Sequence, residues 1–297
     1  WKDGVAAMPA ILAKAAPAET SDEDDDIDSF DPDESSLDVE VFLDIAESVG
    51  DVIVRRANGV MKEAGHLLDN LRWQVPRLSR LRKIEPHTQI SMAKVLSEQA
   101  AAIPDHTFFL WNGRAFTYRD ADRRVTNVAR GLVACGIRKG TKVGVLMEAR
   151  PSYLSMVTAL NRIGAVAVLL APDSTRVTLD QAIAAAGIEV FVTDPENATR
   201  ARAAFGKEVL VLGGGPPHPG RPPLPEGVRD MESIDPDTVV MPPDVAIDAG
   251  RASDLAMIIF TAGRTRTGDQ VRPARITNRR WAFSALGAAA GCALTSD

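Results

Sequence analysis

The residues best suited to chemistry lie together near the end of the chain. Thr261, Gly263, Thr265, Thr267 and Gly268 directly follow an apolar run from Leu255 to Phe260. The apolar run predicts a strand, and the glycines let the backbone turn back on itself with its N–H groups facing inward. Threonine hydroxyls add hydrogen-bond donors at the same place. We therefore predict a phosphate-binding loop over 261–268, and the alternative is an ordinary turn after a buried strand.

The elements that must position this loop alternate between helical and strand patterns. Apolar residues at helical spacing predict helices at 92–102, 118–135, 151–163 and 179–186. Short apolar runs predict strands at 142–147, 165–170, 189–193, 209–212, 239–241 and 255–260. Asn112-Gly113, between 108–111 and 116–118, predicts a hairpin. The fold class is therefore α/β, with a mostly parallel sheet flanked by helices.

Composition excludes several classes of protein. Of the 297 residues, 45% are hydrophobic and 25% are charged, as in ordinary globular proteins. The two cysteines, Cys135 and Cys292, lie far apart, which favours a reducing cytoplasm and argues against a disulfide framework or a zinc site. The four histidines are scattered, so no metal ligand and no catalytic acid, base or nucleophile is assigned.

Other motifs that would indicate a function are missing from the sequence. There is no Gly-x-Ser-x-Gly hydrolase elbow, and no Gly-x-Gly-x-x-Gly dinucleotide fingerprint follows the strand predicted at 209–212. No apolar stretch approaches the roughly 18 residues that a membrane span needs. No nucleic-acid partner is predicted.

Residues 19–37 predict a disordered acidic linker. Twelve acids and no lysine or arginine lie between Glu19 and Glu40. Such a run repels itself and cannot bury enough apolar surface to offset its ordering entropy. A docking tail for a basic partner is the alternative. We interpret residues 1–18 as the remnant of an upstream segment, and we expect the chain to be a fragment of a longer polypeptide.

Residues 38–89 predict an amphipathic and basic helical segment. Within it, Arg72 to Lys83 interleaves basic residues with leucine, valine and Trp73. This pattern suits peripheral contact with an anionic membrane, because the cations can remain in water while Trp73 and the leucines insert. The alternative is a helix packed on its own domain, which the interruption at Pro76 favours.

The order of motifs after Ile90 resembles the amino-terminal part of the adenylate-forming (AMP-binding) enzymes. The resemblance is carried by Phe116-Thr-Tyr-Arg-Asp-Ala-Asp, by the stretch from Leu132 to Met147, and by Leu160-Asn-Arg-Ile-Gly-Ala-Val166. Within that family the chain is most similar to the long-chain and very-long-chain acyl-CoA synthetases of the fatty-acid-transport type. The resemblance implies that residues 90–297 are a truncated AMP-binding domain.

The resemblance also implies roles for particular residues. Thr261, Gly263, Thr265 and Gly268 match the phosphate loop of the family, whereas Ala262 and Arg264 replace an expected serine and threonine. The loop lacks the usual lysine, and Arg272 or Arg275 would supply the cation instead. Thr277-Asn278 stands where threonine–histidine is usual. The candidate binding set is Thr261, Gly263, Arg264, Thr265, Thr267, Gly268, Arg272 and Thr277.

The reaction implied by the resemblance is fatty-acid activation. A fatty carboxylate attacks the α-phosphate of ATP to give acyl-adenylate and pyrophosphate, and coenzyme A then takes the acyl group, with Mg²⁺ assisting. Two other interpretations stay open. One is a ligase-like module without catalytic activity that binds acyl groups or acts as a scaffold. The other is the ligase half of a bifunctional protein with an upstream lipase or acyltransferase domain.

Overall fold

The computed structural model divides the chain into two compact units, residues 1–68 and 69–297. It describes residues 84–215, 223–265 and 268–291, all of them in the second unit. The expectations for the upstream remnant, the acidic linker and the basic segment Arg72–Lys83 therefore fall outside the described residues.

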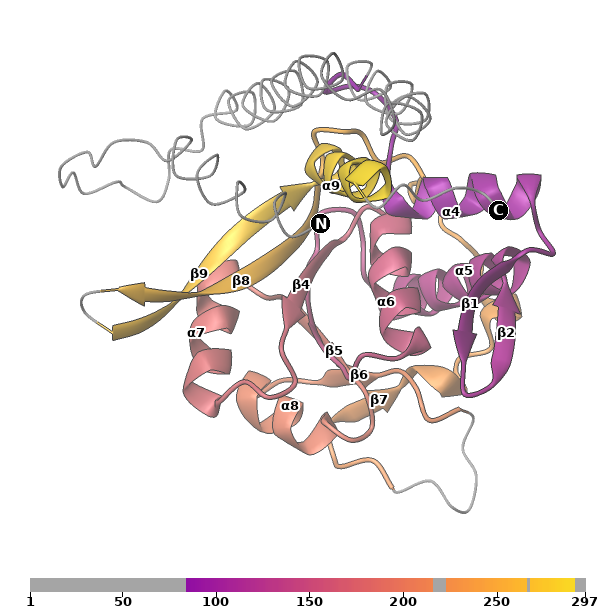
Figure 1. Cartoon of the computed structure of the whole chain (residues 1–297). Coiled ribbons are helices and arrows are strands. Elements are labelled where there is room, and N and C mark those ends of the chain that lie inside the picture. The colour runs from indigo at the N-terminus through magenta and orange to yellow at the C-terminus, as the bar shows by residue number, and fades with distance from the viewer. Residues whose placement is uncertain (1–83, 216–222, 266–267, 292–297) are drawn as a thin grey trace, which may run out of the picture. The chain divides into compact units, whose positions relative to one another are not determined.

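A three-layer α/β arrangement forms the body of the second unit (Figure 1). Its α-helices are α4 (Met92–Ala102), α5 (Tyr118–Ala134), α6 (Pro151–Arg162), α7 (Arg176–Ala186), α8 (Ala198–Phe205) and α9 (Asn278–Gly291). Its strands are β1 (Thr107–Trp111), β2 (Arg114–Thr117), β3 (Lys142–Leu146), β4 (Val166–Leu170), β5 (Val190–Thr193), β6 (Val209–Val211), β7 (Val228–Asp230), β8 (Leu255–Thr265) and β9 (Gly268–Thr277). Two 3-10 turns, η1 (Met231–Ser233) and η2 (Pro236–Thr238), follow β7.

The main sheet has the strand order β7-β6-β5-β3-β4-β8-β9. Every neighbouring pair is parallel except β8 and β9, which are antiparallel. From β3 the chain first moves through α6 to β4, and it then crosses back through α7 to β5 on the other side of β3. The predicted α/β class with a mostly parallel sheet is confirmed.

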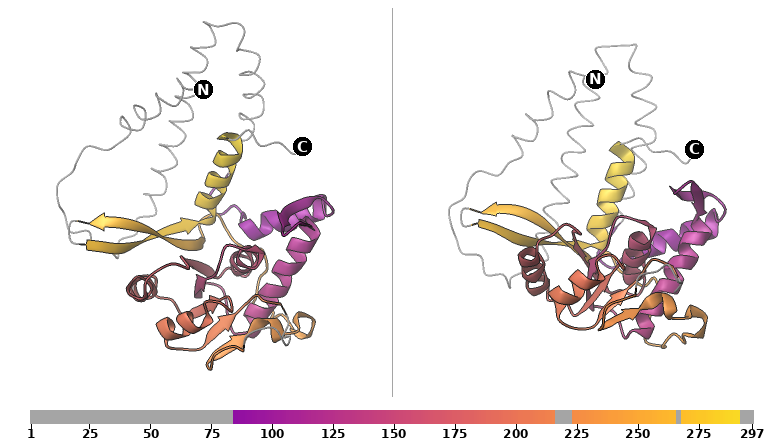
Figure 2. Two further views of the ribbon diagram at one scale, coloured as in Figure 1. Left: turned by 60° about the horizontal axis from the view of Figure 1, so that its bottom comes forward. Right: turned by 90° about the horizontal axis from the view of Figure 1, so that it is seen from below.

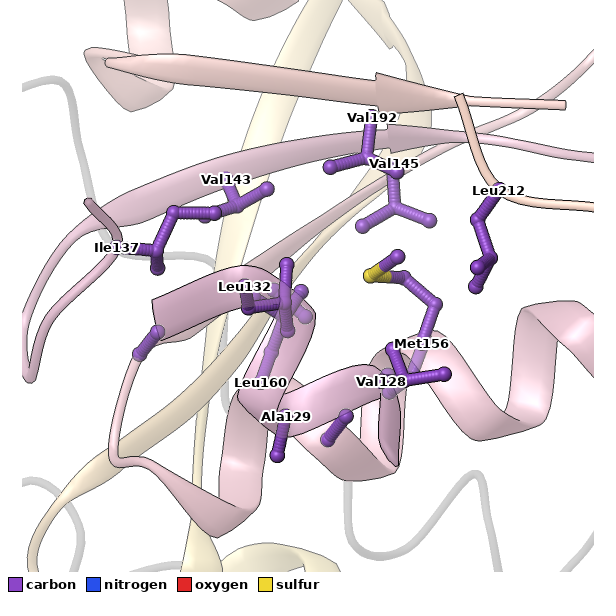
Figure 3. Packing of buried hydrophobic residues seen from close by; sticks show 14 of the residues in the cluster. Val128, Ala129, Leu132, Ile137, Val143, Val145, Met156, Leu160, Val192 and Leu212 are labelled. Carbon is purple, nitrogen blue, oxygen red and sulfur yellow. The ribbon is translucent and has the colours of Figure 1, made fainter. Parts of the chain in front are cut away.

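Alternating side chains along the strands build a core on each face of the sheet. Val143 and Val145 of β3 face the cluster that includes α5 and α6, whereas Leu146 faces the cluster that includes α7 and α8. Figure 3 shows the first cluster, in which Leu132 of α5 and Met156 of α6 lie against β3. Helices therefore cover both faces, which is why the central strands are apolar throughout.

Local signals explain where several elements begin. The Thr117 side chain accepts a hydrogen bond from the Asp120 backbone while Asp120 bonds back to the Thr117 N–H, so a capping box starts α5. Asn112 and Gly113 both adopt positive φ, 48° and 72°, as a tight turn between β1 and β2 requires. The predicted hairpin and the predicted helix at 92–102 are confirmed.

Some expectations for the elements were wrong. No strand forms at 239–241, where Val240 is 87% exposed and two prolines follow at once. The predicted helix at 179–186 begins three residues earlier, because Thr175 caps it by accepting a hydrogen bond from the Thr178 backbone. Four elements were not predicted: α8, β7, β9 and α9.

Candidate functional site

Most of the predicted site residues lie on the hairpin formed by β8 and β9. The first part of β8 belongs to the sheet, where Met257 pairs with Ala167 and Ile258 pairs with Val168 of β4. Beyond this point β8 and β9 continue as a two-stranded ribbon that extends away from the sheet in Figure 1 and in both views of Figure 2. The chain reverses direction between Thr265 and Gly268, whereas Gly263 lies within β8 and does not turn the backbone.

The boundary of the predicted loop was wrong. The strand continues past Phe260 to Thr265, and each of these residues has a partner on β9. Threonine is β-branched and suits a strand as well as a turn, so composition alone could not place the end of β8. Its partner β9 was missed because Pro273 interrupts the pattern. Proline is tolerated there since β9 is the last strand in the sheet order.

The ladder brings some of the predicted residues together. Thr261 pairs with Arg272, Gly263 with Gln270, Arg264 with Asp269, and Thr265 with Gly268, where the ladder ends. The Arg272 side chain is exposed. Thr267 lies outside the described residues. Of the two arginines that the resemblance offers as the cation, Arg272 thus lies opposite Thr261, whereas Arg275 lies opposite Ile258, nearer the sheet.

Thr277 is not brought to the same place. It pairs with Leu255 at the other end of the ladder, roughly 30 Å from Gly268 at about 3.3 Å per strand residue. Its hydroxyl accepts a hydrogen bond from the Arg280 backbone at 3.2 Å, in the manner of a cap for α9. The structure therefore gives Thr277 a position at the base of the hairpin, away from the end that carries Thr265 and Gly268.

Sequence reasoning missed a buried polar network at that base. Asn161 of α6 donates from Nδ2 to Oδ1 of Asn278, the first residue of α9, at 2.9 Å. Next to it, the Arg162 guanidinium is 3% exposed and donates to Asp122 Oδ1 at 2.6 Å, to Thr126 Oγ1 at 2.7 Å and to Asp248 Oδ1 at 3.2 Å. Two polar residues in succession on a buried apolar helix are the signal that could have revealed this network.

A second polar cluster occupies the carboxyl edge of β3 and β5, where open α/β sheets often bind ligands. The Asp194 carboxylate is fully buried and accepts from the backbone N–H of Glu148 at 2.7 Å and of Asn197 at 3.0 Å. Arg150 donates to Glu196 at 2.8 Å. These contacts hold the loop after β3 against the start of α8, so we interpret them as structural.

The contact between Arg150 and Glu196 changes the pKa of both side chains. Its hydrogen bond to Glu196 raises the pKa of Arg150 above the ordinary value. Burial is the largest single effect on Glu196 and would raise its pKa, but the hydrogen bond from Arg150, a backbone hydrogen bond and the positive charge of Arg150 together lower that pKa. Burial raises the pKa of the Cys135 thiol and of the Tyr153 hydroxyl, so neither group is activated at neutral pH.

The described part of the chain offers neither a metal-binding cluster nor a helix that could span a membrane. Among these residues no group of three or more His, Cys, Asp or Glu side chains is placed to hold a metal ion. Over the same residues, every helix is too short or too polar to span a bilayer.

Comparison with known proteins gives a consistent family. The family model described as AMP-binding enzyme matches residues 96–266. Feruloyl-CoA synthase from Amycolatopsis is 30% identical over 168 residues, which are 56% of this chain and 30% of that protein. The chain thus spans less than a third of the length of this relative.

Two solved structures share the fold at low sequence identity. A protein provisionally assigned as a long-chain-fatty-acid CoA ligase from Rhodopseudomonas palustris aligns with a TM-score of 0.57 and 20% identity, over 70% of this chain and 49% of that one. The o-succinylbenzoate CoA synthetase from Bacillus subtilis aligns with a TM-score of 0.52 and 18% identity, over 68% and 36% of the two chains.

Proposed function

The chain belongs to the AMP-binding enzyme family, and we propose on that premise that the protein of which it forms part activates a carboxylic acid with ATP. A carboxylate oxygen attacks the α-phosphorus, pyrophosphate leaves, and an acyl-adenylate results. The sulfur of coenzyme A then attacks the acyl carbon and AMP leaves. The observation that carries this proposal is the family match over 96–266, which runs from α4 into the β8–β9 hairpin.

The hairpin suits a role in holding phosphate oxygens. From Ile259 onward β8 pairs with β9 and no longer with β4, and β9 is the last strand in the sheet order. The N–H groups on the outer edges of this ribbon support a role in ligand binding. The exposed Arg272 adds a positive charge opposite Thr261. We propose that Thr261, Gly263, Thr265 and Gly268 contact the β- and γ-phosphates, and that Arg272 neutralises part of their charge.

Magnesium fits this arrangement as a companion of ATP. The described residues offer no cluster of carboxylates that would hold the ion by itself. Mg²⁺ usually keeps several waters and binds through substrate phosphates with one or two carboxylates. We therefore propose that the ion enters with the nucleotide, and that this chain contributes hydrogen bonds and positive charge to the phosphates.

For the acid, we propose a long-chain fatty acid. This is supported by the order of motifs from Phe116 to Val166 and by the fold shared with the Rhodopseudomonas protein. An aromatic acid is the second candidate, favoured by the 30% identity with feruloyl-CoA synthase. The two acids differ in shape and polarity, so they can be compared directly as substrates.

The test is acid-dependent release of pyrophosphate by the intact protein, with saturated fatty acids of increasing length and with ferulate. We expect release with a long-chain fatty acid, and loss of release when Mg²⁺ is chelated. Preference for ferulate would overturn the fatty-acid assignment and leave the reaction in place. Failure to bind ATP or to release pyrophosphate with any acid would favour the module without catalytic activity.

A further inference from the structure

The amide side chains of Asn161 and Asn278 meet in the interior where the β8–β9 hairpin joins the body of the domain. Asn278 immediately follows β9, and Asn161 lies near the end of α6. They are 5% and 2% exposed, and the hydrogen bond between them spans 117 positions in the sequence. The pair thus ties the exit of the hairpin to a central helix.

Each amide also bonds to a third element. The backbone N–H of Ala93 in α4 donates to Asn161 Oδ1 at 3.1 Å, and Asn278 Nδ2 donates to the carbonyl of Arg251 at 3.0 Å. The backbone N–H of Asn278 donates to the carbonyl of Asp254, the residue before β8, at 3.0 Å. The entry and the exit of the hairpin are therefore held at one point against α4 and α6.

The site is closely fitted around Asn278. A Cβ atom added at Gly250 would lie 3.0 Å from Asn278 Nδ2 and 3.3 Å from Cβ of Ser91. A side chain at position 250 would therefore collide with the Asn278 amide, so glycine is needed there for the amide to keep its place. Because its oxygen and its nitrogen bond to different elements, only one orientation satisfies both partners.

Stability alone is a weak reason to bury two amides at this point. A buried polar group loses its bonds to water, and hydrogen bonds inside the protein roughly offset that loss. Two apolar side chains of similar volume could replace the bond between the amides without loss of stability, and the cost would be confined to the Ala93 N–H and the Arg251 carbonyl, which would lose their partners. What apolar side chains lack is direction, since a hydrogen bond fixes the relative placement of the two groups it joins.

We propose that Asn161 and Asn278 are positioning residues that set where the β8–β9 hairpin lies, and hence where its phosphate-contacting residues meet ATP. This inference rests on the proposed function. Displacing the hairpin should slow formation of the acyl-adenylate. It should have little effect on the later attack of coenzyme A on acyl-adenylate already made, because pyrophosphate has left by then.

The experiment separates these two half-reactions in the intact protein. Asn161→Leu and Asn278→Leu are made singly and together, with the fatty acid that wild type activates fastest. Pyrophosphate release reports the first step, and thioester formation from chemically prepared acyl-adenylate reports the second. We expect at least a tenfold loss in the first step and a rate within twofold of wild type in the second.

Two further variants keep the inference open to refutation. Asn278→Asp retains the size of the side chain and the acceptor for Asn161, and it loses the donor to Arg251; we expect a loss of several-fold, again in the first step alone. Thr117→Ala removes the cap of α5 on the β1–β2 side of the domain, and it should lower thermal stability while leaving both steps intact.

The outcomes distinguish this inference from the proposed function. If wild type is active and both steps fall together in the leucine and aspartate variants, or if neither step changes, the pair is structural only and the inference is overturned. If wild type releases no pyrophosphate with any acid, the proposed function fails, and the inference fails with it.

Discussion

The Arg162 guanidinium and the Asp122 carboxylate form a 2.6 Å ion pair that joins α6 to α5 inside the domain. Arg162 also donates to Asp248 at 3.2 Å, and its own carbonyl accepts from the Asp248 backbone at 2.9 Å. One buried side chain thus links two helices with the segment that precedes β8.

Replacing Arg162 with Ala should lower the free energy of unfolding by about 3–5 kcal/mol, because it leaves two carboxylates and several acceptors without their buried partner. Urea unfolding of the second unit measures this change. The control is Arg176→Ala, which breaks an exposed pair with Asp180 one turn away on α7 and should cost about 0.3–0.5 kcal/mol. Equal losses in the two variants would contradict the assignment.

The contribution of Glu196 to the free energy of unfolding should decrease as pH falls. The folded pKa of Glu196 is lowered, so its pair with Arg150 stabilises the protein at pH above the ordinary glutamate value of 4.5 and stops doing so as pH falls through the folded pKa. Glu196→Gln should therefore have a lower free energy of unfolding than wild type at neutral pH and the same free energy of unfolding in acid. Urea unfolding over a range of pH measures both. The contribution is small, because the side chain is 56% exposed. If Glu196→Gln changes the free energy of unfolding by the same amount when Arg150 is already replaced with Gln, the effect comes from another partner of Glu196.

Thr265→Ala should slow acyl-adenylate formation by roughly ten- to a hundredfold, because a hydrogen bond to a charged group contributes about 1.5–3 kcal/mol. Pyrophosphate release by the intact protein is the measurement. Thr238→Ala in η2, where the hydroxyl donates to the Asp235 carbonyl, is a threonine control that should keep the wild-type rate. A Thr265→Ala variant as fast as wild type would remove this residue from the phosphate site.

Arg272→Ala should raise the KM for ATP by about ten- to a hundredfold if the side chain bonds to phosphate. Arg272→Lys keeps the charge but loses the planar fork of donors, so it should recover only part of the loss. Arg119→Ala, which breaks an exposed pair with Asp105, controls for the removal of a surface charge. Complete recovery with lysine would indicate a purely electrostatic role, and no loss with alanine would contradict the contact.

The basic segment Arg72–Lys83 gives a prediction for the intact protein. Replacing Arg77, Arg80 and Arg82 with Gln should weaken binding to anionic vesicles, because each cation near such a surface contributes about 1 kcal/mol, screened by salt. Co-sedimentation with vesicles at low salt measures the change, with neutral vesicles as the control. Unchanged partitioning would favour packing of this segment on its own domain.

Elements with strong local signals could be predicted from the sequence. The capping residues of α5, the Asn112-Gly113 turn and the apolar runs of β3 and β4 each specify local structure directly. By contrast, β9 lies at an edge and contains Pro273, so its pairing depends on β8 rather than on its own composition. Helix α8 was missed because arginines alternate with its alanines.

The candidate site could be predicted only in part. The residue types alone identify 261–268 as candidate ligand-binding residues. The end of β8, however, depends on its hydrogen bonds to β9, which the sequence pattern does not predict. The position of Thr277 at the opposite end of the ladder follows from the register alone. Asn161 and Asn278 could not be paired, because no periodicity links residues on separate elements that meet only in the folded core.

Phe260 of β8 and Val271 of β9 pack against the apolar cluster that includes α7, so the hairpin extends freely only beyond them. From Val271 to Gly268 the ribbon spans roughly 10 Å, and a rotation of about 5° moves its far end by roughly 1 Å, whereas productive geometry tolerates only about 0.5 Å. A small rotation of the hairpin where it packs on the domain therefore displaces Thr265 and Gly268. Substitutions in the interior of the domain, remote from any substrate, can for this reason reduce activity as much as changes among the threonines themselves.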